Sequence, residues 1–246
     1  ISLGSVVRIH SPLPARLNLI LNNIKKKLQN FFKALTYKTF SLFHGDVRGK
    51  ILAEQDSRIK IEKVVKEKKI NNKIFRISNA RLYTDTVHDT AIILDNLIVQ
   101  GPSYQLRPIN NVRVEENIVF KKGTPRKKIK LKGKILSLLT GGAGNENYFH
   151  WMYDVLPRIG IYEEIFDISK IDYFLLPRLE KIFQKETLDI LNIPEGKRLS
   201  SKTYRHITGS EIITTDHPYC LKNDATNEIQ NIPVWISQWL KKKFLK

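Results

Sequence analysis

The chain has 246 residues, a formal net charge of +18, an apolar fraction of 41% and a charged fraction of 27%. These fractions are ordinary for a globular protein and exclude extensive disorder as the default. No apolar run approaches the ~20 residues that a membrane-spanning helix needs, and the opening Ile1–Val7 lacks the pattern of a secretory leader. The single cysteine, Cys220, excludes a disulfide framework and a cysteine-based zinc site. We therefore expect a cytoplasmic protein, with peripheral contact to the inner face of the membrane left open.

The positive charge favours an anionic partner, which could be nucleic acid, an acidic membrane surface or a phosphate-bearing substrate. The alternative is that many lysines only solvate the surface. The basic stretch 121–130 contains no aromatic residue for base stacking, and no nucleic-acid recognition motif is present. Nucleic acid is therefore the least favoured of these partners.

Residues 1–45 form a basic N-terminal segment around an amphipathic helix predicted over 16–35. Its apolar residues recur at helical spacing, and lysines take the flanking or opposite positions. The apolar set is Leu17, Ile20, Leu21, Ile24, Leu28, Phe31, Phe32 and Leu35. Such a helix either packs on its own domain or lies on an anionic membrane surface, and the sequence leaves both open.

Residues 46–133 form a β-rich region. Residues 81–87 alternate as a strand, and the strands 90–94 and 97–100 are predicted to form a hairpin across Asp95-Asn96. Residues 117–120 are expected to be a further short strand, and 121–130 an exposed connector.

Residues 134–232 change to an alternation of strands and helices, which predicts an α/β domain with parallel strands and right-handed crossovers. A last helix begins near Pro233 and occupies 233–246. The expected strands are 135–139, 172–176, 203–207 and 211–215, with a helix after the first strand and another over 179–192.

A glycine loop follows the strand that ends at Thr140. Ligands of parallel sheets bind beyond the carboxyl ends of strands. Glycines let the backbone approach a ligand, and a helix start attracts anions. Gly141, Gly142 and Gly144 are therefore candidates for binding a substrate. The pattern is weak alone, because tight strand-to-helix turns also need glycine.

His150 and Asp154 stand one turn apart on the helix after this loop, among apolar residues. Burying two ionisable groups costs several kcal/mol unless they pair or serve a ligand. They are therefore either a structural pair or part of a site. Pro157 is expected to kink or end the helix, and Arg158 is a fixed cation suited to phosphate or carboxylate.

The segment Asn147-Tyr-Phe-His-Trp-Met-Tyr-Asp-Val-Leu-Pro-Arg158 resembles the signature of glycosyltransferase family 61, which includes bacterial capsular-polysaccharide proteins. Weaker resemblances flank it, at Arg81-Leu-Tyr83 with Asp95-Asn96, at Phe174–Pro177, at Phe183–Leu188 and at Thr215–Pro218. The resemblance covers roughly residues 80–246. It implies the N-terminal half of a two-domain GT-B transferase, with a parallel Rossmann-like sheet and helices.

The resemblance further implies inverting transfer of a sugar from a nucleotide-sugar donor to a polysaccharide or glycolipid acceptor. Inversion needs a base for the acceptor hydroxyl. We expect His150 to be this base and Asp154 to orient it, with the reversed roles also open. Asn147, Arg158 and the glycine loop would position acceptor or pyrophosphate. Trp151 would either stack on a sugar ring or fill the core.

The chain departs from the family after Pro233, where no motif resembles the donor-nucleotide site. The resemblance therefore implies that the donor-binding domain is absent from this chain, which could be inactive alone. No cofactor is expected, and no Asp-x-Asp pair at a strand end indicates a metal. The polar stretch Asp85–Asp89 is interpreted as a turn. The alternative function is a non-catalytic module that binds an anionic glycan or a membrane surface.

Overall fold

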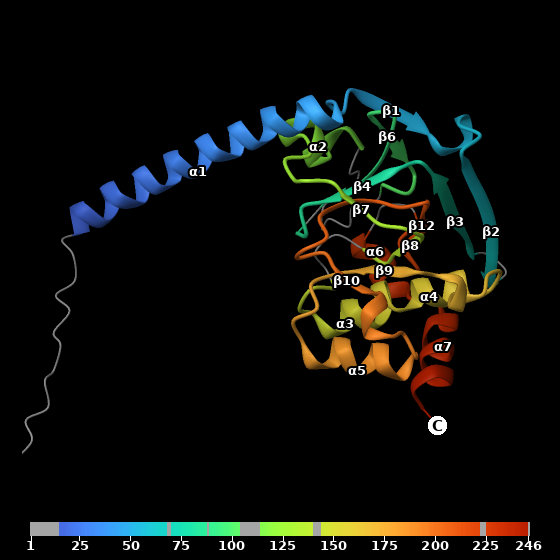
Figure 1. Cartoon of the computed structure of the whole chain (residues 1–246). Coiled ribbons are helices and arrows are strands. Elements are labelled where there is room, and N and C mark those ends of the chain that lie inside the picture. The colour runs from blue at the N-terminus through green and yellow to red at the C-terminus, as the bar shows by residue number, and fades with distance from the viewer. Residues whose placement is uncertain are drawn as a thin grey trace, which may run out of the picture.

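The computed structural model describes residues 15–67, 70–87, 89–103, 114–139, 144–221 and 225–245. It is a mixed α/β structure built on two six-stranded mixed sheets. Figure 1 shows the strands gathered in one body, from which helix α1(Ala15–His44) extends.

The first sheet has the order β1-β6-β5-β4-β11-β7. Its strands are β1(Gly49–Leu52), β6(Leu97–Gln100), β5(Thr90–Leu94), β4(Arg81–Thr84), β11(His206–Thr208) and β7(Ile129–Lys130).

The second sheet has the order β10-β9-β8-β12-β3-β2. Its strands are β10(Arg198–Ser200), β9(Tyr173–Leu176), β8(Lys134–Ser137), β12(Glu211–Thr215), β3(Ile70–Ser78) and β2(Ile59–Glu67). The four strands from β10 to β12 are parallel. This agrees with the prediction for the strands expected over 135–139, 172–176 and 211–215, whereas β10 was not predicted. The strand expected over 203–207 appears instead as β11 of the first sheet, where it pairs antiparallel with β4 and parallel with β7. By contrast, β3 pairs antiparallel with both β12 and β2.

Both sheets join strands from before and after residue 134. In the first, β11 pairs with β4 and β7, and in the second β12 joins β3 to β8. The expected boundary at 133/134 therefore does not separate two structural units, because strands on either side of it share a hydrogen-bonded sheet.

The longer helices are α1, α5(Ile182–Ile190) and α7(Val234–Phe244). The shorter ones are α2(Ile118–Lys122), α3(Tyr148–His150), α4(Pro157–Tyr162) and α6(Ala225–Glu228), and a π-helical turn, η3(Trp151–Val155), links α3 to α4. Short 3-10 turns occupy η1(Ala53–Gln55), η2(Val114–Glu116), η4(Ile168–Lys170), η5(Glu195–Lys197) and η6(Ile229–Asn231).

Three apolar clusters hold these layers together. The middle one lies between the sheets and includes Phe75, Leu82 and Ile135. A smaller one covers the outer face of the first sheet, where Val119 of α2 meets Ile93. Alternation along the strands sends their remaining apolar side chains to the opposite faces, so the fold has a sheet-on-sheet core with helices outside it.

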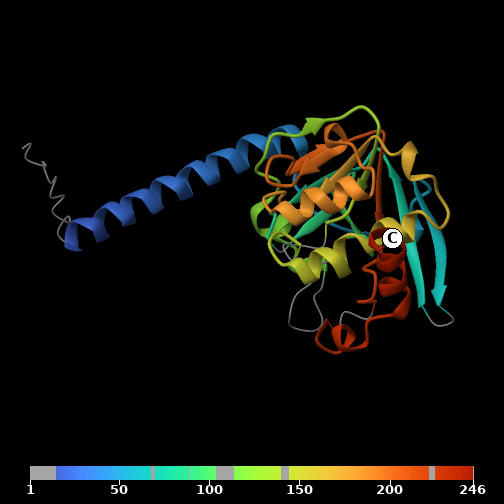
Figure 2. The ribbon, with the colours of Figure 1, turned by 90° about the horizontal axis from the view of Figure 1, so that it is seen from below.

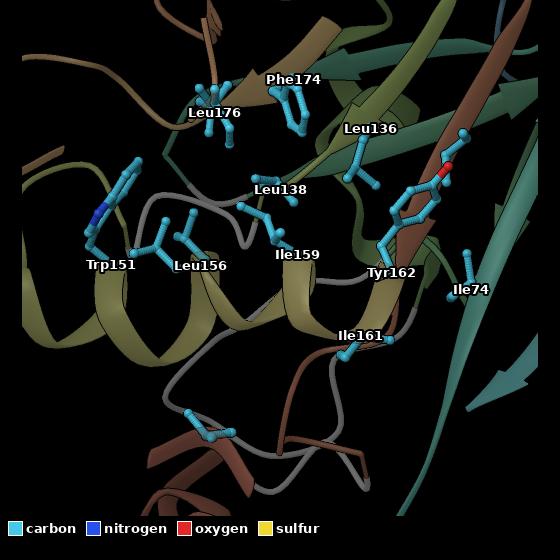
Figure 3. Close-up of a cluster of buried hydrophobic side chains, with 14 of the residues drawn as sticks. Ile74, Leu136, Leu138, Trp151, Leu156, Ile159, Ile161, Tyr162, Phe174 and Leu176 are labelled. Carbon is cyan, nitrogen blue, oxygen red and sulfur yellow. The ribbon is translucent and has the colours of Figure 1, made fainter. Parts of the chain in front are cut away.

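The largest cluster joins the second sheet to the helix formed by α3, η3 and α4. In Figure 3 the helix residues Trp151, Leu156 and Ile159 point toward Leu138, which follows β8, and Leu176 of β9. Ile161 points to the opposite side of the helix, where α4 contacts α7. The later part of this helix, α4, is thus buried, whereas Tyr148 and Phe149 at its start are exposed.

The predicted hairpin is confirmed. Leu94 pairs with Leu97, and Asp95 and Asn96 have positive φ angles of 48° and 64°. Two successive left-handed residues are the geometry of a type I′ turn, whose twist matches that of the flanking strands, and Asn and Asp tolerate it.

The strand predicted over 117–120 is wrong, because these residues begin helix α2. The Asn117 side chain accepts a hydrogen bond from the Val119 amide and caps the helix. Gly123, with a positive φ of 57°, ends it. Capping groups at both ends stabilise a short helix over apolar residues that could also form a strand.

Helix α1 is longer than predicted and projects away from the sheets in both views (Figures 1 and 2). Over 17–44 the partly buried residues are Tyr37, Phe40, Ser41 and His44, all near its C-terminal end. The large apolar residues over 17–35 are exposed. Within the described ranges, no helix is long and apolar enough to span a bilayer.

Candidate functional site

The site is built on the helix that follows β8. Asn147 caps this helix, and its side-chain oxygen accepts hydrogen bonds from the amides of Phe149 at 2.9 Å and His150 at 3.3 Å. This capping satisfies amides that would otherwise have no partner at the start of a helix. Asn147, predicted to position substrate, thus has a structural role in placing His150.

A π-helical turn follows the cap. The Leu156 amide donates to the Trp151 carbonyl at 3.1 Å, one residue further back than in an α-helix. Pro157 has no N–H and cannot continue the α-helical ladder, so a wider turn precedes it. The helix nevertheless continues through Pro157 to Tyr162. Pro157 therefore does not end the helix but occupies the first position of α4, which proline favours.

His150 and Asp154 are hydrogen-bonded across this turn. His150 Nδ1 lies 2.7 Å from Asp154 Oδ2. The Asp154 side chain is completely buried, whereas the His150 side chain is 24% exposed. Nδ1 is therefore engaged by a fixed carboxylate, and Nε2 on the other side of the ring is the nitrogen available to a substrate.

Two residues beyond β12 complete the surroundings of Asp154. The Tyr219 hydroxyl donates to Asp154 Oδ1 at 2.7 Å, and His217 Nε2 lies 3.7 Å from Asp154 Oδ2. His217 Nδ1 accepts from the Cys220 amide at 3.0 Å, which fixes the ring proton on Nε2, facing the carboxylate. Asp154 is thus held from three directions.

Sequence reasoning missed His217 and Tyr219 as members of this site. The available signal was their position just after β12, which runs parallel to β8. Residues that follow neighbouring parallel strands emerge at the same edge of a sheet, which brings them to the helix after β8.

The electrostatics follow from these contacts. The hydrogen bond to Asp154 raises the pKa of His150 above its usual value, against the opposing effect of partial burial. Burial alone would raise the pKa of Asp154, but the contacts from His150, His217 and Tyr219 outweigh it and hold that pKa below its ordinary value. Burial lowers the pKa of His217. The carboxylate is therefore charged at neutral pH, and His217 is neutral.

An aromatic side chain, Phe149, contacts His150. Phe149 contacts the imidazole edge-on, with ring centroids 5.5 Å apart, and stacks on Tyr153 at 4.9 Å. Tyr148 and Phe149 are themselves exposed. Flat apolar faces beside a polar group suit the apolar faces and hydroxyls of a sugar.

A cavity of about 320 Å³ lies beside His217, the histidine next to Asp154. Its lining includes Asp216, His217 and Cys220, together with Lys73 and Asn71. His150 is not among its lining residues. His150, whose side chain is partly exposed, lies beside Phe149, while His217 borders this separate cavity.

Arg158 does not lie where an anion could reach it. It is 2% exposed, and its guanidinium donates to the carbonyls of Thr215 at 3.1 Å and Asp154 at 3.3 Å. These hydrogen bonds tie the helix to the end of β12. They give Arg158 a structural role in place of the expected contact with phosphate or carboxylate.

Trp151 is fully buried and offers no face to a sugar. Its indole Nε1 donates to Thr187 Oγ1 of α5 at 2.8 Å, and its ring packs in the largest cluster. Of the two roles considered for Trp151, packing is the one its environment supports, because a ring enclosed by protein cannot stack on a ligand.

Of the predicted glycine loop, Gly141 and Gly142 lie outside the described residues. Gly144 is buried, and a Cβ added to it would lie 2.4 Å from Val155 Cγ2. Its carbonyl accepts from Gln184 Nε2 of α5 at 2.9 Å. Gly144 therefore allows the loop to pack tightly on the helix, a role that does not need a ligand.

Asn145, next to Gly144, links three segments. Its side chain donates to the Thr86 carbonyl at 2.7 Å and accepts from the Arg178 amide at 2.8 Å. The loop before helix α3 is thereby fixed to the turns after β4 and β9. Within the described ranges, no three His, Cys, Asp or Glu side chains are grouped to hold a metal ion.

No protein-family model, curated protein or solved structure compared with this chain matches it. The geometry around His150 and the sequence of residues 147–158 are therefore the features of this chain that bear on its function.

Proposed function

We propose that the chain is the acceptor-side part of an inverting glycosyltransferase, with His150 as the general base. The observation that carries the proposal is a partly exposed imidazole hydrogen-bonded through Nδ1 to a fully buried carboxylate, Asp154. This is the arrangement that orients a histidine base and stabilises its protonated form. The resemblance of residues 147–158 to family 61 transferases indicates the reaction class.

In the proposed reaction, an acceptor hydroxyl hydrogen-bonds to His150 Nε2. As its oxygen attacks the anomeric carbon of a nucleotide-sugar, the hydroxyl proton passes to Nε2. The bond between the anomeric carbon and the diphosphate oxygen breaks on the opposite face, and the nucleoside diphosphate leaves with the bonding electrons. The configuration at carbon is inverted, and Asp154 stabilises the imidazolium that forms.

The burial of Asp154 favours His150 over the reversed assignment. A base must come within hydrogen-bond reach of the proton that it removes. The Asp154 side chain has no exposed surface, and hydrogen bonds from His150 and Tyr219 engage both of its oxygens. In the proposal, Asp154 is therefore a positioning residue.

The proposal is tested in the protein encoded by the whole reading frame that contains this chain. Purified protein is incubated with a panel of nucleotide-sugars and with polysaccharide and glycolipid acceptors, and transfer is followed by mass spectrometry. We expect His150→Ala to lose on the order of a hundredfold in rate or more. Glu146→Gln is the matched control, because it changes an exposed residue close to His150 in sequence and leaves His150 and Asp154 intact. Full activity of a folded His150→Ala protein would overturn the proposal.

A second candidate function, binding of an anionic glycan without catalysis, is favoured by a cavity of about 540 Å³ between α1, α2 and β4. Its lining includes Lys33, Lys122, Arg126 and Arg205, with Asp85 as the acidic member. In this account Arg126→Glu abolishes binding of an anionic polysaccharide, measured by calorimetry, and His150→Ala leaves it unchanged. If Arg126→Glu leaves binding unchanged and His150→Ala reduces it, the transferase is favoured.

A further inference from the structure

Helix α1 carries an apolar face that the described body leaves uncovered. Large side chains along it are 41–62% exposed. They recur every three or four residues and therefore share one side of the helix. They are Leu17, Ile20, Leu21, Ile24, Leu28, Phe31, Phe32 and Leu35. We call this set the α1 apolar face.

The body holds α1 by its other side. Tyr37, Phe40 and His44, the partly buried aromatic residues of the helix, recur at helical spacing near its C-terminal end. His44 contacts His206 of β11 with ring centroids 4.9 Å apart. At about 100° per residue, these positions lie roughly opposite Leu28 and Leu35. Most of the α1 apolar face therefore lies on the side of the helix away from the sheets, and Phe32 at its edge borders a cavity next to β4. Figure 2 shows that the helix projects from the body.

The charge of α1 is of one sign. The sequence from Ala15 to His44 contains Lys25, Lys26, Lys27, Lys33 and Lys38 and no Asp or Glu. Lys25 and Lys27 flank the α1 apolar face, while Lys26 and Lys33 lie on the other side of the helix. Long lysine side chains at such flanks extend their ammonium groups toward lipid phosphates while the apolar face is buried.

The positive surface continues from the helix into the body. Lys33 of α1 lines the cavity of about 540 Å³ together with Lys122, Arg126 and Arg205. Phe32 borders the same cavity. The cationic groups of the body are thus close to the end of the α1 apolar face, where they can meet the same anionic surface.

We propose that α1 lies in the plane of an anionic lipid bilayer, with its apolar face in the acyl-headgroup boundary and its lysines on the phosphates. From Leu17 to Leu35 the face extends about 27 Å along the helix, which suits a helix lying on the membrane. The inference does not depend on the proposed transferase activity.

A second copy of the chain fits this face less well. Leu17, Leu21, Ile24, Leu28, Phe31 and Leu35 do follow the heptad spacing of a coiled coil. However, the apolar face is wider than that seam, because Ile20 and Phe32 extend it. The positions beside the seam include Lys25 and Lys27 with no acidic residue to pair with them. Two such helices would bring like charges together, whereas an anionic bilayer neutralises them.

The test is flotation of the whole chain with vesicles of phosphatidylcholine alone or mixed with phosphatidylglycerol. We expect binding to the mixed vesicles and little to the neutral ones. Phe31→Glu should lose binding at least tenfold, and its matched control Asn30→Glu, which adds the same charge next to it on the polar side, should retain more of it. Lys25→Glu/Lys26→Glu/Lys27→Glu should weaken binding on the order of a hundredfold.

Circular dichroism confirms that each variant is folded, and light scattering gives the oligomeric state. Equal binding to both vesicle types would overturn the proposal, as would equal binding by the folded Phe31→Glu and Asn30→Glu proteins. A stable dimer that dissociates in Phe31→Glu and does not bind vesicles would also overturn it and assign the face to self-association.

Discussion

His150 Nδ1 and Asp154 Oδ2 lie 2.7 Å apart across a π-helical turn, and of these two side chains only His150 reaches the surface. A buried carboxylate that is itself fixed by Tyr219 holds the imidazole in one orientation.

The pKa of His150 should fall when Asp154 is changed to Asn. The hydrogen bond to the carboxylate is the largest cause of the raised pKa, and partial burial opposes it. An amide keeps the shape but removes the negative charge, so the effect of burial dominates. NMR titration of the imidazole signals measures the change. Asp189→Asn, which alters an exposed carboxylate of α5, should leave the pKa unchanged, and an unchanged pKa in Asp154→Asn would contradict the prediction.

The stability that His150 contributes should decrease with increasing pH. Its pKa in the folded state is raised, so this contribution is fully present below about pH 6.5 and is lost as the pH rises through the folded-state pKa. Urea unfolding of the wild type and His150→Gln, at about pH 5 and about pH 9, gives the two differences in free energy of unfolding. The difference should be larger at the lower pH.

His44 provides the matched control of opposite sign. Burial, with Lys128 and Arg81, lowers the pKa of His44. A lowered folded-state pKa costs stability at low pH, and this cost disappears as the pH rises. The wild type should therefore gain stability relative to His44→Gln with increasing pH. The same trend in both variants would show that the contacts of His150 do not govern its titration.

Gly144→Ala should destabilise the protein by about 1–3 kcal/mol. The new Cβ would lie 2.4 Å from Val155 Cγ2 and 3.1 Å from Pro177 Cγ, so either the loop or the helix must shift. Gly196→Ala is the matched control, because no heavy atom lies within 4 Å of its Cβ position. Thermal unfolding monitored by circular dichroism should separate the two, and equal melting temperatures would contradict the packing described here.

Asn147→Ala should cost about 1 kcal/mol of stability. The change removes the acceptor for the amides of Phe149 and His150. Asn147→Ser, which restores a capping oxygen, should recover most of the loss. If Asn147→Ala changes binding of an acceptor while the free energy of unfolding stays constant, then the residue binds substrate, as first expected, rather than capping the helix.

The features that could be predicted from the sequence are those set by local spacing. Leu94 and Leu97 flank a turn whose residues tolerate positive φ, and His150 and Asp154 are one helical turn apart. Periodicity also predicted the apolar face of α1. It did not predict that this face is exposed, because a pattern of side chains does not show what covers them.

The features that could not be predicted depend on contacts distant in sequence. Ile77 of β3 pairs with Ile212 of β12. The sequence pattern changes near residue 134, but it could not show that strands on either side of this position share a sheet. Tyr219, which follows β12, donates to Asp154 on the helix that follows the neighbouring strand β8. The short helix α2 was missed because capping by Asn117 outweighed apolar spacing that equally fits a strand.

The most direct test of the central claim is the pH dependence of kcat/KM for sugar transfer in the wild type and in Asp154→Asn. If His150 removes the acceptor proton, kcat/KM should rise with pH through the raised pKa of His150 and then level off. In Asp154→Asn the inflection should move to lower pH and the plateau should fall. A wild-type profile without this inflection, or an inflection at the same pH in Asp154→Asn, would contradict the assignment of His150 as the base.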